Sequence, residues 1–380
     1  MSRILLLSPD LARNVTYPPW QVAGSLRRLG HEAVLAGPAS GPFWPPLAEQ
    51  LKEAVVLGER WVDRPGWERS VDLAARSDLI YPFKALPTSL GLGLALRRRT
   101  GQRLALHLDD WDAGYLSGSS RLRRFWYGIK DLSTPRGLAW LQICDALTSR
   151  ADVISVSTKM LQDRYGGTIL RQGVDTDLFS PQRFTRENAR LRLGIPASEP
   201  MVLFLGTPAP HKGLAALEVL DGPLAKGVWL VGASREDWIR AGVGPGLLKA
   251  AHLHDSVSVL DAAWYMAASD IFVIPQTASA FAQYQLPAKL LQAMSLGCCV
   301  VASEVGDIRE ILGGPEPAGI LLPPDDPAQL GETLQSLVRE PERRGILGAR
   351  ARSRAERALG WDAMGRTLVG ILREAGIDDA

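Results

Sequence analysis

Cysteine is scarce in this sequence. Its 380 residues include three cysteines, and two of them, Cys298 and Cys299, are adjacent. Three cysteines in this arrangement make neither a disulfide framework nor a zinc site. The sequence therefore excludes the small proteins that are stabilised by several disulfide bonds or by zinc.

Long hydrophobic runs are also missing. No apolar stretch approaches the ~20 residues that a membrane-spanning helix needs. The N-terminal segment MSRILLLSPD contains only a short apolar run, which predicts a first strand rather than a signal peptide. We therefore expect a soluble, cytoplasmic protein.

An excess of charge of one sign is absent as well. The formal net charge is +2, which argues against nucleic acid as a partner. Hydrophobic residues make up 46% of the chain, so it is not mainly disordered. A length of 380 residues favours two or three domains over a single core.

Apolar runs of strand length alternate with helical patterns along the chain. Near-continuous apolar strands of this kind indicate parallel sheets covered on both faces. The expected strands of the first series are residues 4–7, 33–36, 79–81, 104–108 and 153–156, and those of the second are 202–205, 228–231, 257–260, 271–274 and 299–302. His252 and His254 precede one of these runs and are expected to be surface or loop residues.

Turn residues and a proline in RQGVDTDLFSPQRF separate the two series. The sequence thus predicts an α/β architecture of two Rossmann-like, doubly wound domains, residues 1–180 and 181–361. The cleft between two such domains is the default ligand site.

The segment from Asp270 to Glu310 is the most informative part of the second domain. A buried strand runs into a loop, a helix that Pro287 opens, and a further strand. A helix N-terminus beside the carboxyl ends of parallel strands favours phosphate binding. We therefore expect a phosphorylated ligand at this edge.

Several motifs carry a family resemblance when they are taken in order. They are LRRLGHEAVLAGP (26–38), ADVISVSTKM (151–160), ILRQGVDTDLF (169–179), VLFLGTPAPHKGL (202–214) and PAKLLQAMSLGCCVVAS (287–303). On these motifs the sequence resembles the GT-B-fold glycosyltransferases, in particular the retaining, nucleotide-sugar-dependent family four.

The resemblance implies a retaining glycosyltransferase that needs no metal or other cofactor. The donor would be a nucleoside diphosphate sugar held by the second domain, and the acceptor a glycan, glycolipid or small molecule. It also implies that a last helix, residues 362–380, returns to the first domain.

The donor loop contains a glycine turn and a lysine. Gly206 allows a close approach of backbone to ligand, and the Lys212 ammonium could neutralise a diphosphate. The resemblance implies that Gly206, Thr207 and Lys212 bind the donor and that Lys212 is catalytic. The alternative is that Lys212 is a solvated loop residue.

The family's E-x7-E acids fall on Tyr284 and Gln292, and neither is acidic. Gln292 could still bond a ribose hydroxyl, and Tyr284 could donate one hydrogen bond near the sugar. With the backbone of Leu286, Pro287 and Ala288, these residues complete the expected donor site. Two alternatives follow: an active enzyme of a divergent branch, or a non-catalytic nucleotide-sugar-binding or partner-activating protein.

The segment HLDDWD places four polar groups after a strand of the first domain. The resemblance assigns His107 a place near the donor sugar, so His107 and Asp110 are expected to be catalytic. The acids at Asp109, Asp110 and Asp112 could bind an acceptor hydroxyl, act as a base or orient His107. They do not indicate a metal, and they could instead form an ordinary turn.

Two further features concern the acceptor side. Trp20 follows a stiff Tyr-Pro-Pro loop and could stack on an acceptor or pack against the second domain. Basic and aromatic residues could form a peripheral contact with the inner membrane face, or simply a solvated helical face. That set consists of Arg97, Arg98, Arg99, Arg103, Arg121, Arg123, Arg124, Trp126, Tyr127 and Lys130.

Overall fold

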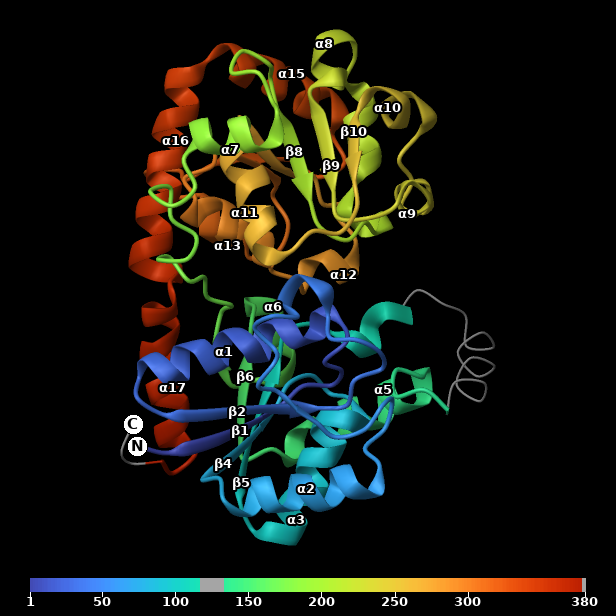
Figure 1. Ribbon diagram of the computed structural model, residues 1–380, viewed down its shortest axis with the longest axis vertical. Coiled ribbons are helices and arrows are strands. Elements are labelled where there is room, and N and C mark those ends of the chain that lie inside the picture. Colours follow the sequence, from blue (N-terminus) through green and yellow to red (C-terminus); the bar gives the residue numbers. More distant parts are fainter. Residues whose placement is uncertain (117–132, 378–380) are drawn as a thin grey trace. The chain divides into compact units, whose positions relative to one another are not determined.

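The computed structural model describes residues 1–116 and 133–377. The chain forms two compact units (Figure 1). Unit 1 consists of Met1–Gln172 and Trp361–Ala380, and unit 2 is the single segment Gly173–Gly360. The boundary between the units therefore lies after residue 172. The turn residues in the sequence had predicted it at residue 180.

Unit 1 is built on a parallel sheet of seven strands within the described residues. The strand order is β3-β2-β1-β4-β5-β6-β7, and every neighbouring pair is parallel. The strands are β1 Arg3–Leu7, β2 Glu32–Gly37, β3 Val55–Val56, β4 Leu79–Pro82, β5 Arg103–Leu108, β6 Val153–Val156 and β7 Thr168–Ile169.

The helices of unit 1 cover this sheet. They are α1 Tyr17–Arg28, α2 Arg64–Ala75, α3 Leu92–Thr100, α5 Leu138–Leu147, α6 Lys159–Tyr165 and α17 Trp361–Glu374. Side chains on both faces of β4 are buried, as expected for a strand covered on both sides.

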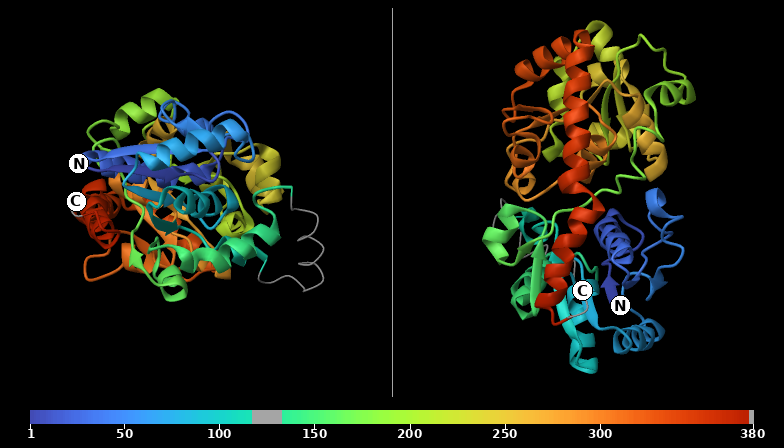
Figure 2. Two further views of the ribbon diagram at one scale, coloured as in Figure 1. Left: turned by 90° about the horizontal axis from the view of Figure 1, so that it is seen from below. Right: turned by 90° about the vertical axis from the view of Figure 1, so that its left-hand side faces the viewer.

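The last helix, α17, belongs to unit 1 and lies against α1 (Figure 2). The Ser25 hydroxyl donates a hydrogen bond to the Trp361 carbonyl at 2.8 Å. The Trp20 and Trp361 rings meet edge to face at 5.5 Å. Trp20 therefore packs against α17 within its own unit. Its expected stacking on an acceptor stays a prediction.

Unit 2 is built on a second parallel sheet, with six strands among the residues described. Its order is β10-β9-β8-β11-β12-β13. The strands are β8 Val202–Leu205, β9 Val228–Val231, β10 His252–His254, β11 Ile271–Ile274, β12 Val300–Ser303 and β13 Ile320–Leu322.

Ten helices of unit 2 have described bounds, and the short α12 among them lies inside the loop that follows β11. They are α7 Arg186–Leu193, α8 Gly222–Lys226, α9 Arg235–Arg240, α10 Pro245–Ala250, α11 Val259–Ala268, α12 Ala280–Gln283, α13 Ala288–Ser295, α14 Ile308–Leu312, α15 Pro327–Arg339 and α16 Pro341–Arg354.

One expected strand was wrong. Residues 257–260 run into α11, which Ser258 caps through a hydrogen bond from the Asp261 N–H. The edge strand is instead β10, so His252 and His254 lie on a strand and not in a loop. His252 is exposed and His254 half-buried, as expected for surface residues. Their rings stack on Trp229 at 4.3 and 5.0 Å.

In the described part of the chain, none of the helices combines the length and apolar character needed to cross a bilayer.

Candidate functional site

The loop that follows β8 carries the candidate phosphate-binding lysine. Gly206 ends the strand with φ +142°, a conformation that L side chains rarely adopt. A short 3-10 turn, Pro210–Lys212, follows. The Lys212 ammonium donates a hydrogen bond to the Thr207 carbonyl, and a Cβ built on Gly206 would lie 3.8 Å from that ammonium.

This loop packs directly on the loop that follows β11. The Thr277 N–H donates to the His211 carbonyl at 3.0 Å, and the His211 and Phe281 rings meet at 5.0 Å. A Cβ on Gly213 would lie 1.9 Å from the Pro275 carbonyl oxygen, so the contact leaves no room for a side chain. The turn that carries Lys212 and the loop that leads from β11 to α13 are thus held together.

Helix α13 begins at Ala288, with Pro287 as its N-cap residue. No side chain caps this end. The Leu290 N–H donates to the Pro287 carbonyl at 3.0 Å, which leaves the amides of Ala288 and Lys289 to a ligand or to water. Leu286 is buried just before the cap. The sequence predicted a helix N-terminus here, and the structure shows it beside the loop that carries Lys212.

Lys289 in the first turn of α13 is the functional candidate that sequence reasoning missed. Its ammonium makes no hydrogen bond or ion pair with any residue that the structure describes. Burial, and next the charge of Lys212, lowers its pKa to about 8. Lys212, from the loop after β8, and Lys289, from the first turn of α13, therefore act on one another electrostatically. The P-x-K motif of residues 287–289 is the sequence feature from which Lys289 could have been predicted.

The two positions that replace the family's acids differ in environment. Tyr284 is the half-buried C-cap residue of α12, in the loop that leads from β11 to α13. Gln292 lies on α13 with 1% of its surface exposed. The expected contacts of these residues with the donor's sugar and ribose stay predictions.

Lys84 lies at the carboxyl-end edge of the sheet of unit 1, and the sequence did not predict it as a site residue. It follows β4 with φ +68°, which is unusual for a residue other than glycine. Its side chain is 3% exposed, and its ammonium lies 3.1 Å from Asp109, 2.7 Å from Asp110 and 3.2 Å from Asp112. The three acids of HLDDWD thus converge on a lysine from the neighbouring strand.

The Lys84 cluster, which we define as Lys84 with Asp109, Asp110 and Asp112, has shifted protonation equilibria. Burial alone would lower the pKa of Lys84, but the three carboxylates together raise it well above its ordinary value. Burial raises the pKa of Asp109 and of Asp112. Asp110 and Asp112 are the more exposed acids and the ones that a ligand could reach.

His107 is a buried strand residue. Its side chain is 2% exposed, and Nδ1 lies 3.0 Å from the Ser155 hydroxyl on β6. Burial, and next the charge of Lys84, lowers its pKa to about 3. The imidazole is therefore neutral, and its charged neighbour is Lys84 rather than an orienting carboxylate. Its catalytic role near a donor sugar stays a prediction.

The basic residues of unit 1 are partly tied to the fold. The Arg97 guanidinium lies 2.8 Å from Asp152 and donates to the Arg150 carbonyl at 2.6 Å. Arg103 donates to the Ala375 carbonyl at 3.3 Å. Six members of the set lie outside the described residues, namely Arg121, Arg123, Arg124, Trp126, Tyr127 and Lys130.

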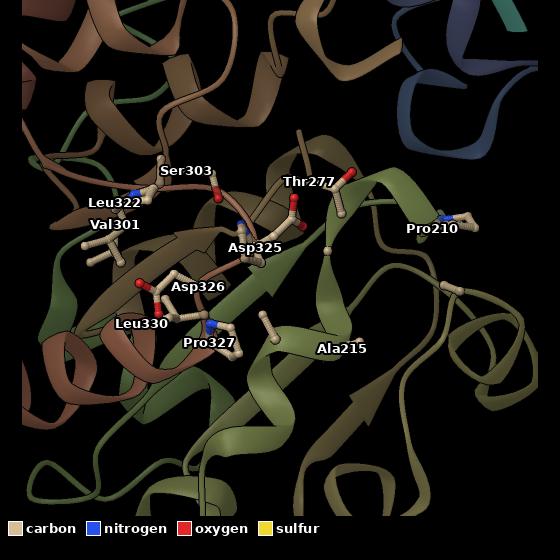
Figure 3. Close-up of a pocket in the computed structure, with 16 residues that line it drawn as sticks. Pro210, Ala215, Thr277, Val301, Ser303, Leu322, Asp325, Asp326, Pro327 and Leu330 are labelled. Carbon is tan, nitrogen blue, oxygen red and sulfur yellow. The ribbon is translucent and has the colours of Figure 1, made fainter. Parts of the chain in front are cut away.

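A pocket of about 310 Å³ opens in unit 2 beside the Lys212 loop (Figure 3). Its acids are engaged in the fold. The Ala278 N–H donates to Asp325 at 3.1 Å, and Asp326 caps α15. Neither Lys212 nor Lys289 lines this pocket, so it is separate from the lysine pair.

Across residues 1–116 and 133–377, no group of three or more His, Cys, Asp or Glu side chains is placed to hold a metal ion. The three acids of the Lys84 cluster surround an ammonium instead.

Comparisons with known proteins point to one family. A family model described as "Glycosyl transferases group 1" matches residues 199–340, which include Lys212 and Lys289. A D-inositol 3-phosphate glycosyltransferase of Xylanimonas cellulosilytica is 30% identical over 306 residues, covering 73% of this chain and 70% of the relative. One from Thermomonospora curvata is 32% identical over 252 residues, covering 58% of this chain and 56% of that protein.

Solved structures share the fold over nearly the whole chain. Sucrose-phosphate synthase from Thermosynechococcus elongatus superposes with a TM-score of 0.72 at 20% identity, covering 98% of this chain and 99% of the other. HepE from Anabaena, solved in complex with UDP-glucose, gives 0.71 at 18% identity, with 98% and 100% covered. The two-sheet architecture is therefore the GT-B fold. The chain spans only about half to three fifths of the length of several sequence relatives.

Proposed function

The chain belongs to the group 1 glycosyltransferase family, and we propose that it moves a sugar from a nucleoside diphosphate sugar to an acceptor hydroxyl with retention of anomeric configuration. The observation that carries this proposal is the position of Lys212, on the glycine turn after β8 and against the loop that leads to α13. A cation beside an uncapped helix N-terminus is suited to a diphosphate.

The chemistry would be mainly electrostatic. As the bond from the sugar to the diphosphate breaks, negative charge grows on the leaving diphosphate, and the Lys212 ammonium would exchange the Thr207 carbonyl for a phosphate oxygen. The amides at the start of α13 would add partial positive charge. No metal ion is part of the proposal, because the cations are supplied by the chain. HepE, a neighbour in fold, was solved with UDP-glucose, which supports a nucleotide-sugar donor.

The Lys84 cluster would serve the acceptor. Asp110 and Asp112 could accept hydrogen bonds from hydroxyl groups of a sugar or polyol. Three acids around one lysine give this edge an excess of negative charge, so we propose a neutral acceptor rather than a phosphorylated one. In this respect the chain would differ from relatives named for inositol 3-phosphate.

Thermal shift against UDP-, GDP- and ADP-sugars tests the donor class, since bound ligand raises apparent stability by RT ln(1 + [L]/Kd). Release of diphosphate is then followed with a panel of neutral, phosphorylated and lipid-linked acceptors, and the anomeric configuration of the product is read by NMR. Co-sedimentation with anionic vesicles, at two salt concentrations, tests the membrane contact. A chain that binds none of the donors contradicts the proposal.

A non-catalytic nucleotide-sugar-binding protein is the second candidate. It is favoured by Tyr284 and Gln292, which occupy the positions of the family's acids and cannot supply a carboxylate. Such a protein would bind a donor in calorimetry and release no diphosphate with any acceptor in the panel. Sustained turnover with one acceptor would exclude it.

A further inference from the structure

A second cation, Lys289, stands at the start of α13 within the electrostatic reach of Lys212. We propose that Lys289 binds the diphosphate of the donor together with Lys212, so that a lysine from the loop after β8 and a lysine from the first turn of α13 clamp one dianion. This inference rests on the proposed donor class and assigns a contact residue to it.

The geometry brings the two lysines to one place. Lys212 ends a turn that begins after β8, and Lys289 lies in the first turn of the helix that follows the neighbouring strand β11. The two loops are joined by the Thr277–His211 hydrogen bond and the His211–Phe281 ring contact. Both lysines therefore sit at the carboxyl-end edge of adjacent parallel strands, where doubly wound folds bind ligands.

The charges around Lys289 do not balance within the described residues. The ammonium is half-buried and has no acidic partner there, and the charged group that acts on it is another lysine. A half-buried ammonium without a counterion costs folding free energy. An anion held between the two lysines would remove that cost, and the depressed pKa of Lys289 has the direction expected for a site that awaits one.

The chemistry of the ligand fits two cations better than one. The diphosphate of a nucleotide sugar carries two negative charges, and Lys212 matches one of them. Lys289 and the amides of its own helical turn would match the second. During transfer the leaving diphosphate gains a further charge, so a second ammonium would contribute most at that stage.

Calorimetry on the full chain tests the proposal with UDP, GDP and ADP, each compared with its nucleoside. Lys289→Met keeps the length of the side chain and removes the charge. It is expected to weaken binding of the preferred nucleoside diphosphate by about 10-fold or more, the scale of a charge-assisted hydrogen bond. Binding of the matching nucleoside should not change, and Lys289→Arg should recover part of the loss.

Matched variants separate the possible failures. Lys226→Met, at an exposed lysine of α8 in the same unit, should bind like the wild type. If Lys212→Met loses affinity and Lys289→Met does not, the clamp is wrong and the donor site stands. If the wild type binds none of the three diphosphates, both the clamp and the proposed function are wrong. A thermal unfolding curve for Lys289→Met that matches the wild type excludes loss of fold as the cause of weaker binding.

Discussion

The carboxyl ends of the two sheets carry opposite charge. In unit 1 a lysine is enclosed by three aspartates. In unit 2 the lysine pair Lys212 and Lys289 lies beside a helix start. One doubly wound framework thus presents an edge suited to hydroxyl groups and another suited to phosphate. The difference arises in the loops, because the strands beneath both edges are buried and apolar.

The comparison also separates two uses of a buried lysine. Lys84 is neutralised by its own neighbours, so it contributes to the fold without a ligand. Lys289 has no such neighbour among the described residues, so its charge is best explained by a ligand. Four predictions test the comparison of the two edges, and they follow from the largest expected effect to the smallest.

Substitution by methionine should destabilise the protein at Lys84 and should not destabilise it at Lys289. Lys84→Met leaves three clustered carboxylates without their cation and is expected to cost about 3–5 kcal/mol. Lys289→Met removes an uncompensated charge and should leave the melting temperature unchanged or raise it. Differential scanning calorimetry of both variants is the measurement. A similar loss of stability in the two variants would remove the contrast.

Lys212→Ala should abolish most of the activity and little of the stability. Loss of one group that stabilises developing charge lowers turnover by about 100-fold or more. Initial rates of diphosphate release measure this, with Lys226→Ala as the exposed-lysine control. An unchanged turnover for Lys212→Ala would count heavily against the donor site.

His107 should make unit 1 sensitive to acid. Its pKa in the folded protein lies near 3, below the ~6.5 of an unfolded histidine. The unfolded chain therefore binds the extra proton first, and stability falls as pH drops below ~6.5. Between pH 7.5 and 5 this group alone should cost about 2 kcal/mol. Asp109, with its raised pKa, acts in the opposite sense, so the difference between wild type and His107→Gln is the quantity to compare. Identical pH profiles for the two proteins would contradict the prediction.

Asp110→Asn should affect only the acceptor. Loss of a charged hydrogen-bond acceptor is expected to raise the acceptor KM by about 10-fold and to leave the donor KM unchanged. Asp72→Asn, at an exposed acid of α2 that pairs with Arg76, is the matched control. If the donor KM rises instead, the assignment of this edge to the acceptor is wrong.

Much of the fold could be predicted, because buried parallel strands appear in the sequence as short apolar runs. The apolar run at residues 257–260 was wrongly predicted to be a strand. The start of an apolar helix and an apolar strand have the same composition over four residues. The true edge strand, β10, contains histidines whose rings cover Trp229. Local sequence gives no sign of that covering contact.

The candidate site was only half visible in the sequence. Gly206 and Lys212 lie close together in the sequence of one loop, and Pro287 marks the start of α13. Lys84 could not be foreseen, because its convergence with the acids depends on its left-handed backbone and on the pairing of β4 with β5. The charge of Lys289 becomes informative only when the neighbouring loop supplies a second lysine.

The return of α17 to unit 1 means that the polypeptide passes between the units twice, after Gln172 and after Gly360. Unit 2 is consequently an insertion into unit 1 and can be excised as one continuous fragment. Unit 1 cannot be obtained by simple truncation, because a stop codon near residue 360 would remove the helix that covers α1. A fragment of unit 1 therefore needs a short linker that joins residue 172 directly to residue 361.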